Sequence, residues 1–386
     1  MDMYKDEMNV SGADLYSGLQ KIFPDGKNLT LTERLDAARG PLLSWYRENR
    51  RDLPWRENRD AYRIWISEIM LQQTRVEAVK PYFARFMEHF PTVQALADCE
   101  EEELFKCWEG LGYYSRARNL KKAAEIIVSE YGGALPADHA ALLSLPGIGS
   151  YTAGAIGSIA FGIPVPAVDG NVMRVLSRVA GSYEDILKQA VKKKMELAVE
   201  ETLKTLKEGE AGDFNQALIE TGAIVCVPNG APLCGAPCPF YTVCEARKKD
   251  LTAEIPVKTP KKKRKIEEKT VLLVECGDKI AIRKRDDTGL LASLYEFPNL
   301  EGKLSGKEVL EQMKCRAVIE KELPTAKHIF SHVEWHMSGY LIRVTEEIPG
   351  LLFADREELK EKYPIPNAFA AYRKIAAAQT MDSCES

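Results

Sequence analysis

The chain changes its hydrophobic pattern once, at the segment Leu251–Thr270, and this change implies two domains of different architecture. Before that segment, apolar residues recur every three to four positions, as amphipathic helices require, and no strand-like alternation is found. After it, β-branched and apolar runs such as Thr270–Glu275 and Lys279–Lys284 stand between turn residues and predict strands. The prolines and the basic run Lys261–Lys265 of the segment itself are typical of a solvated linker.

The length of 386 residues is enough for two to three domains. We expect a loose N-terminal extension over 1–34, an all-α core over 35–247, a linker over 248–269 and an α+β domain over 270–386. Helical periodicity in the core predicts helices over Ala61–Thr74, Val76–His89, Glu100–Glu109, Ser115–Glu130, Ala137–Leu145, Tyr151–Phe161, Asn171–Ala180, Ile186–Thr205 and Asp213–Cys226. In the last domain, a further strand is expected over His336–Val344, and helices over Lys307–Lys314 and Arg356–Lys362.

Composition and charge exclude several classes of protein. Hydrophobic residues make up 45% of the chain, which is globular rather than disordered, and the net charge of −4 excludes a uniformly basic nucleic-acid binder. The first residues lack the basic start and apolar core of a signal peptide. The uncharged stretch Ala140–Val168 contains several prolines and glycines, so it cannot form a membrane-spanning helix. We therefore expect a cytoplasmic protein without a membrane partner.

Four of the nine cysteines are clustered, at Cys226, Cys234, Cys238 and Cys244. In a chain without an export signal, such a cluster indicates a metal site rather than disulfides. Four thiolates suit either a [4Fe–4S] cluster or a structural zinc ion. Only the Cys234–Cys238 spacing is typical of a zinc-binding pair, so the pattern favours iron–sulfur and leaves zinc as the alternative.

The segment Leu145–Thr152 has the sequence of a helix-hairpin-helix. A predicted helix runs into a tight turn with Gly147 and Gly149, and a second helix follows. Glycines allow positive φ and close approach of the backbone to a ligand, and the free N–H groups of the second helix form an anion site. A DNA phosphate is the expected anion. The alternatives are an ordinary helix–helix turn and a dinucleotide loop, but no strand precedes the segment, as a dinucleotide loop requires.

Two carboxylates are candidates for catalysis. On a helix, Glu68 has apolar neighbours at three and four residues, which raise the pKa of a carboxyl group and suit it to act as a general acid. The alternative is an exposed helical glutamate. Asp169 precedes the helix expected from Asn171, so it is either an N-cap or a carboxylate that faces a developing cation. Taken alone, the residue favours the N-cap, a position where aspartate is common.

Taken in order, these parts resemble the helix-hairpin-helix DNA glycosylases with an iron–sulfur loop, and among them the adenine DNA glycosylases of the MutY type. The resemblance extends from about Arg50 to Tyr372. Its motifs are Arg51–Trp55, Trp65–Arg75, Trp108–Ser115, Leu145–Gly149, Val168–Val172 and Phe330–His332. It implies an all-α core in two lobes with an iron–sulfur loop, followed by a C-terminal α+β Nudix-like domain.

The resemblance also assigns roles to residues. Glu68 would protonate N7 of a flipped adenine, and Asp169 would stabilise the oxocarbenium ion that forms as the N-glycosidic bond breaks. Tyr151 and Asn171 match positions that support this step. Positions that line the adenine pocket are matched by Arg51, Trp55, Arg56 and Glu220. Residues that enter the duplex near the lesion are matched by Gln73 and Tyr113, and Gly147 and Gly149 belong to the hairpin that binds phosphate.

One position separates two branches of the superfamily. Members that also cut the strand carry a Schiff-base lysine two residues beyond the second hairpin glycine, and here that residue is Tyr151. We therefore expect a monofunctional glycosylase that leaves an abasic site. The rival classes are a strand-cutting glycosylase for oxidised pyrimidines and a catalytically silent DNA-binding module. Tyr151 and the additional domain over 270–386 argue against the first class, and intact Glu68 and Asp169 argue against the second.

The C-terminal domain resembles the Nudix-like domain of the same family but lacks the Gly-x5-Arg-Glu-U-x-Glu-Glu helix that holds catalytic metals. Arg356–Glu361 only mimics that helix, so nucleotide hydrolysis is not expected. The resemblance places Phe330, Ser331 and His332 near 8-oxoguanine. The expected partner is double-stranded DNA with 8-oxoguanine:adenine or guanine:adenine mispairs, bound by a monomer. The cysteine spacing of seven, three and five residues departs from the family's six, two and five.

Overall fold

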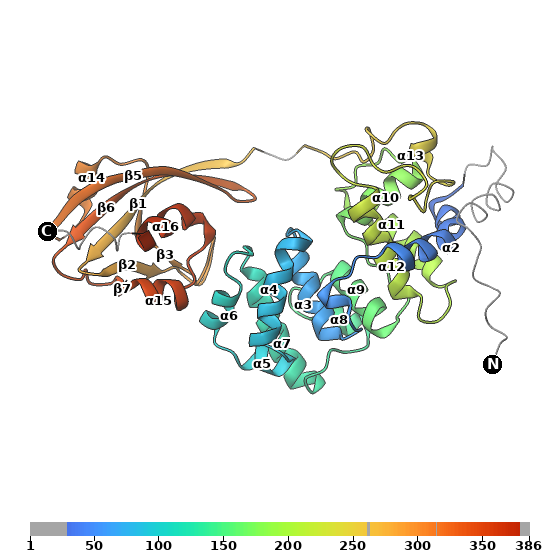
Figure 1. Cartoon of the computed structure of the whole chain (residues 1–386), viewed down its shortest axis with the longest axis horizontal. Helices are drawn as coiled ribbons and strands as arrows, with labels where there is room; N and C mark the ends of the chain where they lie inside the picture. Colours follow the sequence, from blue (N-terminus) through green and yellow to red (C-terminus); the bar gives the residue numbers. More distant parts are fainter. Residues whose placement is uncertain (1–28, 261–262, 314, 379–386) are drawn as a thin grey trace. The chain divides into compact units, whose positions relative to one another are not determined.

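The computed structural model describes residues 29–260, 263–313 and 315–378. The chain forms two compact units (Figure 1). The first contains the chain up to Ala84 together with Ala123–Pro260. The second contains Arg85–Lys122 together with the chain from Lys261 onwards. The chain therefore enters the second unit twice.

The first unit is helical. Its elements are α2 (Leu31–Asn49), the 3-10 turn η1 (Pro54–Arg56), α3 (Ala61–Leu71), the first part of α4 (Val76–His89), the end of α7 (Ser115–Tyr131), α8 (His139–Ser144), α9 (Ser150–Phe161), α10 (Gly170–Ala180), α11 (Gln189–Leu203), α12 (Ala211–Glu220), the π-helical η2 (Thr221–Val225) and α13 (Glu245–Lys248).

Helix α9 is the buried centre of this unit, and it packs against α3, α8 and α12. Two glycines allow the close approach. A Cβ atom on Gly154 would lie 1.9 Å from the carbonyl oxygen of Pro166, and one on Gly212 of α12 would lie 2.7 Å from the carbonyl oxygen of Ser158. Because backbone cannot yield at such distances, these positions require glycine. The packing fixes the start of α9 against α3, where the candidate carboxylate lies.

Helix α2 begins inside the segment that the sequence analysis assigned to a loose extension. Oγ1 of Thr30 accepts a hydrogen bond from the amide of Glu33, and the Glu33 carboxylate accepts one from the amide of Thr30, which is a capping box. The prediction is wrong for Leu31–Arg34, which belong to α2: Arg34 is buried in the core beside the next residue, Leu35. The rest of the predicted extension, 1–28, lies outside the described residues.

The predicted solvated linker is also partly wrong. Ile255 is buried in the core of the helical unit, and Leu251 packs against the same core. Arg178 of α10 donates hydrogen bonds to the carbonyl oxygens of Thr252 and Ile255, at 2.9 and 2.8 Å. The described part of the segment up to Val257, whose carbonyl accepts from the amide of Ile186, therefore belongs to the helical core. At the C-terminal end of the predicted linker, β1 already begins at Lys265, whereas the α+β domain was expected to begin at residue 270.

The second unit combines helices with a mixed sheet. Its helices are the rest of α4 and α7, α5 (Val93–Asp98), α6 (Glu101–Cys107), α14 (Gly306–Gln312), α15 (Arg356–Glu361), the 3-10 turn η3 (Asn367–Phe369) and α16 (Ala370–Ala378). Its strands are β1 (Lys265–Cys276), β2 (Lys279–Lys284), β3 (Tyr295–Glu296), β4 (Asn299–Glu301), β5 (Ala317–Ile329), β6 (Val333–Val344) and β7 (Leu352–Ala354).

The strands follow the order β3-β2-β1-β6-β5, with β4 on β1 and β7 on β2. Strands β1 and β6 pair in parallel, and the other described pairs are antiparallel. Alternate residues of β1 serve two cores, because successive side chains of a strand point to opposite faces. Val271 and Leu273 contribute to the core under α15 and α16, while Leu272 and Val274 contribute to the core under α14.

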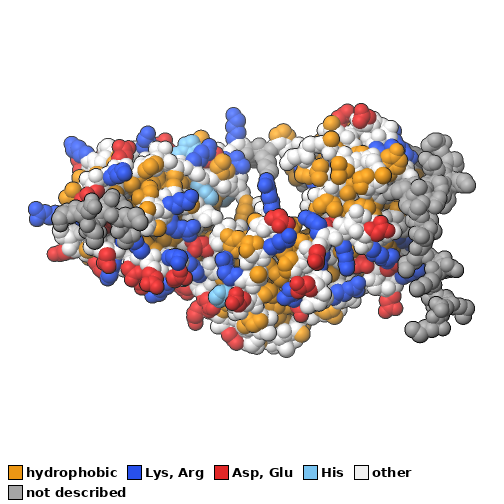
Figure 2. Space-filling model, in the orientation of Figure 1, with side chains coloured by type: hydrophobic (Ala, Val, Ile, Leu, Met, Phe, Trp, Pro, Cys, Tyr) orange, Lys and Arg blue, Asp and Glu red, His pale blue; other side chains and the backbone are white. Residues whose placement is uncertain are grey.

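The fold class predicted from the sequence is confirmed: a helical region is followed by an α+β domain with a mixed sheet. Lys and Arg side chains are interspersed with Asp and Glu side chains on the face shown in Figure 2, as the net charge of −4 leads one to expect. No helix among the described residues has the length and apolar character needed to cross a membrane.

Candidate active site

A cavity of about 740 Å³ in the helical unit brings together most of the candidate catalytic residues, and its volume falls in the range of small-molecule sites. Its walls come from η1, α3, the starts of α9 and α10, and α12. The candidate residues that line it are Arg51, Trp55, Arg56, Glu68, Gln73, Tyr151, Asp169 and Asn171.

Glu68 of α3 is buried, with 8% of its surface exposed, which excludes the exposed helical glutamate. The hydroxyl of Tyr151 donates a hydrogen bond to Glu68 Oε2 at 2.7 Å. Burial raises the pKa of Glu68 to about 7. The hydrogen bond from Tyr151 opposes this rise, and the charge of Asp169 adds to it. A carboxyl group with such a pKa holds a proton near neutral pH and can deliver it as a general acid.

Tyr151 lies in the first turn of α9. Burial and the neighbouring carboxylates Glu68 and Asp169 raise the pKa of Tyr151 well above its usual value, so the phenol keeps its proton and remains a donor. The hairpin that precedes it has Gly147 at φ +77° and Gly149 as the N-cap of α9, without a capping side chain. A Cβ on Gly149 would meet no atom within 4 Å, so the space before the helix amides is open.

Asp169 is the N-cap of α10, so the structural role considered for it is observed. Its Oδ1 accepts from the amides of Asn171 and Val172, at 2.9 and 2.7 Å, and its Oδ2 accepts from the Asn171 side chain at 2.9 Å. Burial raises the pKa of Asp169, and these hydrogen bonds oppose the rise. The cap and a catalytic role are compatible, because the capped carboxylate lines the same cavity as Glu68.

Two arginines of α10 that the sequence analysis did not consider join Asp169 to the cysteine loop. Arg174 donates to Asn171 Oδ1 at 3.1 Å and to the carbonyl oxygen of Cys226 at 2.9 Å. Arg178 donates to Cys226 Sγ at 3.3 Å. Arg174 follows Asn171 by three residues and Arg178 follows Arg174 by four, so the three side chains share one helix face, which was a usable signal for the contact between Asn171 and Arg174.

The carboxylate of Glu220 holds two arginines at the rim of the cavity. Arg51 Nε donates to Glu220 Oε1 at 2.7 Å, and Arg56 Nη2 donates to Oε2 at 2.8 Å. Burial raises the pKa of Glu220, but the hydrogen bonds from Arg51 and Arg56 outweigh burial and lower it to about 2. Trp55, which lies between Arg51 and Arg56 in the sequence, is buried. Its ring packs edge-on against that of Phe83, with the ring centroids 5.4 Å apart.

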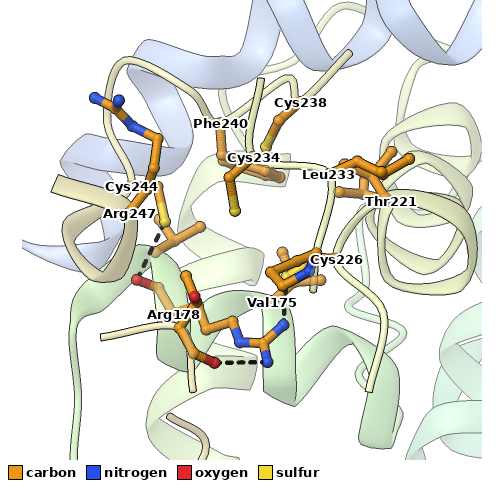
Figure 3. A pocket seen from close by; sticks show the side chains of 14 residues that line it. Val175, Arg178, Thr221, Cys226, Leu233, Cys234, Cys238, Phe240, Cys244 and Arg247 are labelled. Carbon is orange, nitrogen blue, oxygen red and sulfur yellow. Dashed lines mark hydrogen bonds between the residues drawn. The ribbon is translucent and has the colours of Figure 1, made fainter. Parts of the chain in front are cut away.

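The four clustered cysteines line one cavity between α10, η2 and α13 (Figure 3). Apolar side chains such as Val175, Leu233 and Phe240 complete the lining and limit access of water. Thiolates around a single zinc ion would lie about 3.8 Å apart, because a Zn–S bond is about 2.3 Å long. Among the described residues, no group of three or more His, Cys, Asp or Glu side chains is placed to bind one metal ion. The four thiol groups that line the cavity are the donor set of both a [4Fe–4S] cluster and a structural zinc ion.

A third cavity, of about 400 Å³, lies in the second unit. It is lined by the turn Gly110–Ser115 between α6 and α7 and by the turn Phe330–His332 between β5 and β6. The hydroxyl of Tyr113 and Oγ of Ser331 are hydrogen-bonded at 3.2 Å. Phe330 packs edge-on against His328 and Trp335. The structure thus groups most of the predicted site residues around three cavities: Gln73 with the carboxylates, the four cysteines together, and Tyr113 with Phe330, Ser331 and His332.

Comparisons with known proteins assign one family to the helical region and another to the C-terminal domain. Residues 66–201 match the family model of the HhH-GPD superfamily base excision DNA repair proteins, and residues 270–374 match the NUDIX domain. The adenine DNA glycosylase of Homo sapiens is 34% identical over 376 residues, which cover 81% of this chain and 68% of that protein. The adenine DNA glycosylase of Buchnera aphidicola subsp. Schizaphis graminum (strain Sg) is 34% identical over 307 residues, which cover 79% of this chain and 87% of that protein. The structure of a thermostable thymine-DNA glycosylase aligns at 30% identity over 54% of this chain and 94% of that chain, with a TM-score of 0.47.

The helical fold with its hairpin, the two matched families and the buried carboxylate define a base excision DNA repair protein with a C-terminal NUDIX domain. The chain belongs to the adenine DNA glycosylase family, whose members are hydrolases of N-glycosidic bonds.

Proposed function

We propose that this chain removes adenine paired with 8-oxoguanine or guanine in double-stranded DNA and leaves an abasic site. The observation that carries the proposal is the group of Glu68, Tyr151 and Asp169 in one cavity, with the pKa of Glu68 near 7. One protonated and one ionised carboxyl group is the pair that hydrolysis of a glycosidic bond requires. The names of the relatives supply the base, adenine.

The target adenine leaves the base stack and enters the cavity, because its glycosidic bond cannot be reached inside the duplex. Arg51 and Arg56 bring positive charge to the rim, and Glu220 holds both guanidinium groups in place. Trp55 supplies a flat apolar wall, since it is buried but lines the cavity. These residues bind and orient the base before the chemical step.

Glu68 transfers its proton to N7 of the adenine, so the base leaves as a neutral molecule when the bond between C1′ and the base nitrogen breaks. The bonding electrons depart with the base, and the sugar becomes an oxocarbenium ion. The Asp169 carboxylate stabilises this cation, and the three hydrogen bonds that Asp169 accepts favour its ionised form. Water then adds to C1′ and returns a proton to Glu68, which restores the enzyme.

Strand cleavage through a Schiff base is not part of the proposed reaction. That chemistry needs an amine two residues after Gly149, where this chain has the phenol of Tyr151. The hydroxyl of Tyr151 is committed to Glu68, and its raised pKa keeps it protonated. The rival interpretation as a strand-cutting glycosylase therefore has no nucleophile at the usual position.

The proposed cofactor is a [4Fe–4S] cluster held by Cys226, Cys234, Cys238 and Cys244. Bound there, the cluster would supply free energy that folds the cysteine loop onto α10 rather than any group for the reaction at the sugar. The buried lining of the cavity and the contact of Arg178 with Cys226 Sγ support this assignment.

Recognition of 8-oxoguanine is proposed for the cavity of the second unit, through Phe330, Ser331, His332 and the inserting residue Tyr113. Gln73 is proposed to enter the duplex beside the target adenine, and the hairpin amides at Gly147 and Gly149 to bind a phosphate. We further propose that the protein acts as a monomer on DNA in the cytoplasm, where its cysteines stay reduced. All cysteines among the described residues are free.

The test is single-turnover cleavage of an 8-oxoguanine:adenine duplex, with and without alkali, beside a thymine-glycol duplex. Strand breaks on the adenine strand that require alkali are expected. Alkali-independent breaks at thymine glycol would replace the proposal by a glycosylase with lyase activity. Binding of the mispaired duplex without any cleavage, in a preparation that contains iron, would favour the silent DNA-binding module.

A further inference from the structure

The turn that carries Tyr113 needs support from outside itself. Gly110 and Gly112 have φ of +106° and +68°, and Tyr113 itself has φ of +49°, which is unfavourable for a residue with a side chain. A turn with two such glycines loses much conformational freedom when it is held in one shape. Tyr113 is also 46% exposed, so burial of its own ring does not fix the turn.

Glu109, the residue before this turn, is held by charges from two elements. Its carboxylate forms an ion pair with Arg373 of α16 and another with Lys106 of α6, the latter at 2.8 Å. The Glu109 side chain is only 12% exposed, so water screens these pairs less than pairs on the surface. Arg373 also donates to the carbonyl oxygen of Ile365, which ties it to the chain before α16.

Lys106 extends the same contact toward α15. Its Nζ lies within hydrogen-bond distance of the carbonyl oxygens of Leu359 and Tyr363, at 3.4 and 3.3 Å. These carbonyls belong to the end of α15 and the residues that follow it. Lys106 therefore bridges three groups: a carboxylate of the helical segment and two backbone carbonyls of the C-terminal domain.

Further hydrogen bonds join the C-terminal domain to Gly110, at the start of the turn, and to Arg118 of α7, which follows it. The side chain of Asn367 donates to the carbonyl oxygen of Gly110 at 3.3 Å, and Arg118 donates to that of Ala292 at 2.9 Å. The Tyr113–Ser331 hydrogen bond joins the tip of the turn to the turn between β5 and β6. The C-terminal domain thus contacts the start, the tip and the end of the segment that carries Tyr113.

We propose that Lys106, Glu109 and Arg373 are positioning residues for recognition of the base opposite the target adenine. Their ion pairs hold the turn Gly110–Tyr114 in register with the turn Phe330–His332, so that Tyr113 and Ser331 face the same base. The C-terminal domain therefore acts partly through a segment of the helical region and not only through its own contacts with the lesion. This inference rests on the proposed function, since it concerns how that function discriminates between mispairs.

The experiment compares full-length Arg373→Ala with Lys374→Ala, its neighbour on α16, whose side chain is exposed. Single-turnover rates of adenine excision are measured on 8-oxoguanine:adenine and guanine:adenine duplexes. Arg373→Ala is expected to lower the ratio of the two rates by about fivefold or more, the size of a typical coupling between sites. The guanine:adenine rate and both rates of Lys374→Ala stay at the wild-type values.

A charge reversal separates positioning from a general loss of structure. Glu109→Arg alone and Arg373→Glu alone are expected to lower the ratio, and the double variant is expected to restore most of it. Hydrogen exchange of the amides at 110–114 in the free protein gives a readout independent of catalysis. Exchange should be faster in Arg373→Ala and unchanged in Lys374→Ala.

Each outcome decides between the two proposals. Wild-type protein that excises no adenine from either duplex overturns the proposed function and with it the basis of this inference. Wild-type protein that discriminates between the mispairs, with Arg373→Ala discriminating equally well, overturns only the positioning role. An equal fall of both rates in Arg373→Ala, without recovery in the charge-reversed pair, also overturns it, because the ion pair then supports catalysis or folding in general.

Discussion

Replacing Glu68 by glutamine should abolish base excision and at the same time stabilise the protein at neutral and alkaline pH. Glutamine cannot donate the acidic proton, so the chemical step loses its general acid. Its amide oxygen can still accept the hydrogen bond from Tyr151, which keeps the local geometry. The variant removes the one feature that the buried site disfavours, the ionised carboxylate.

The size of the stabilisation follows from the pKa of Glu68, which rises from 4.5 to about 7 on folding. A carboxyl group with a raised pKa binds its proton more tightly in the folded state, so it destabilises the fold as pH rises from about 4.5 and reaches its full effect above about 7. The shift corresponds to about 3 kcal/mol at pH 8. Glu68→Gln titrates nowhere in this range, so it escapes the loss.

The assay is urea unfolding of wild type and Glu68→Gln at several pH values from 5 to 8. The difference in free energy of unfolding should be less than about 1 kcal/mol at pH 5 and grow to about 3 kcal/mol at pH 8. Glu77→Gln is the control, because Glu77 is exposed on α4 with only a surface ion pair to Lys80. The wild-type rate of excision should fall as pH rises through about 7. A pH-independent difference in stability, or excision that survives in Glu68→Gln, would refute the reasoning.

Three further substitutions test the rest of the site. Asp169→Asn should slow single-turnover excision by about a hundredfold or more. The melting temperature should stay nearly unchanged, because asparagine is an equally good N-cap. A fall in stability without a fall in rate would leave Asp169 only its structural role. Glu220→Gln should lower the free energy of unfolding by about 3 kcal/mol at pH 7, since Arg51 and Arg56 lose their charged partner. The difference between wild type and variant should disappear as pH falls from about 4.5 toward 2, because Glu220 is then protonated in the wild type as well. Gly149→Ala should lower the free energy of unfolding by no more than about 1 kcal/mol, because alanine is a poorer N-cap than glycine but its methyl group meets no protein atom. The variant should weaken duplex binding in anisotropy titrations; unchanged binding would remove this turn from the phosphate contact.

Local patterns predicted most helices of the core, because an amphipathic helix shows its period in a short stretch of sequence, but α2 and α5 were not among them. Local patterns did not predict segments whose structure depends on contacts with residues distant in the sequence. The segment around Ile255 is rich in prolines and charges, but Arg178 captures its carbonyls from a helix far away in sequence. Strand β5 was not predicted, since as an edge strand it is mostly exposed and carries no clear alternation. The start of α2 was predictable from Thr30 and Glu33, a signal that was overlooked.

The candidate site likewise contains residues that local sequence predicts and contacts that only the folded chain shows. The apolar surroundings of Glu68 and the cap position of Asp169 are visible in neighbouring residues, and the structure places both at one cavity. The contact between Arg51 and Glu220 joins residues 169 positions apart, so only the family resemblance suggested that they belong together. The contact of Arg174 with Cys226 could not be predicted, because nothing in the spacing of the cysteines says which helix they approach.

The chain passes through the second compact unit twice, first at Arg85–Lys122 and again after Lys261, and this has a consequence for how the protein can be divided. A truncation at the start of β1 removes a sheet and also strips α6 of the contacts that Lys106 and Glu109 make. A shortened protein would therefore expose a face that the intact chain covers. The smallest autonomous piece that retains the lesion-facing turn with Tyr113 has to be built from two separate stretches of sequence, as a circular permutant or a co-expressed pair of fragments.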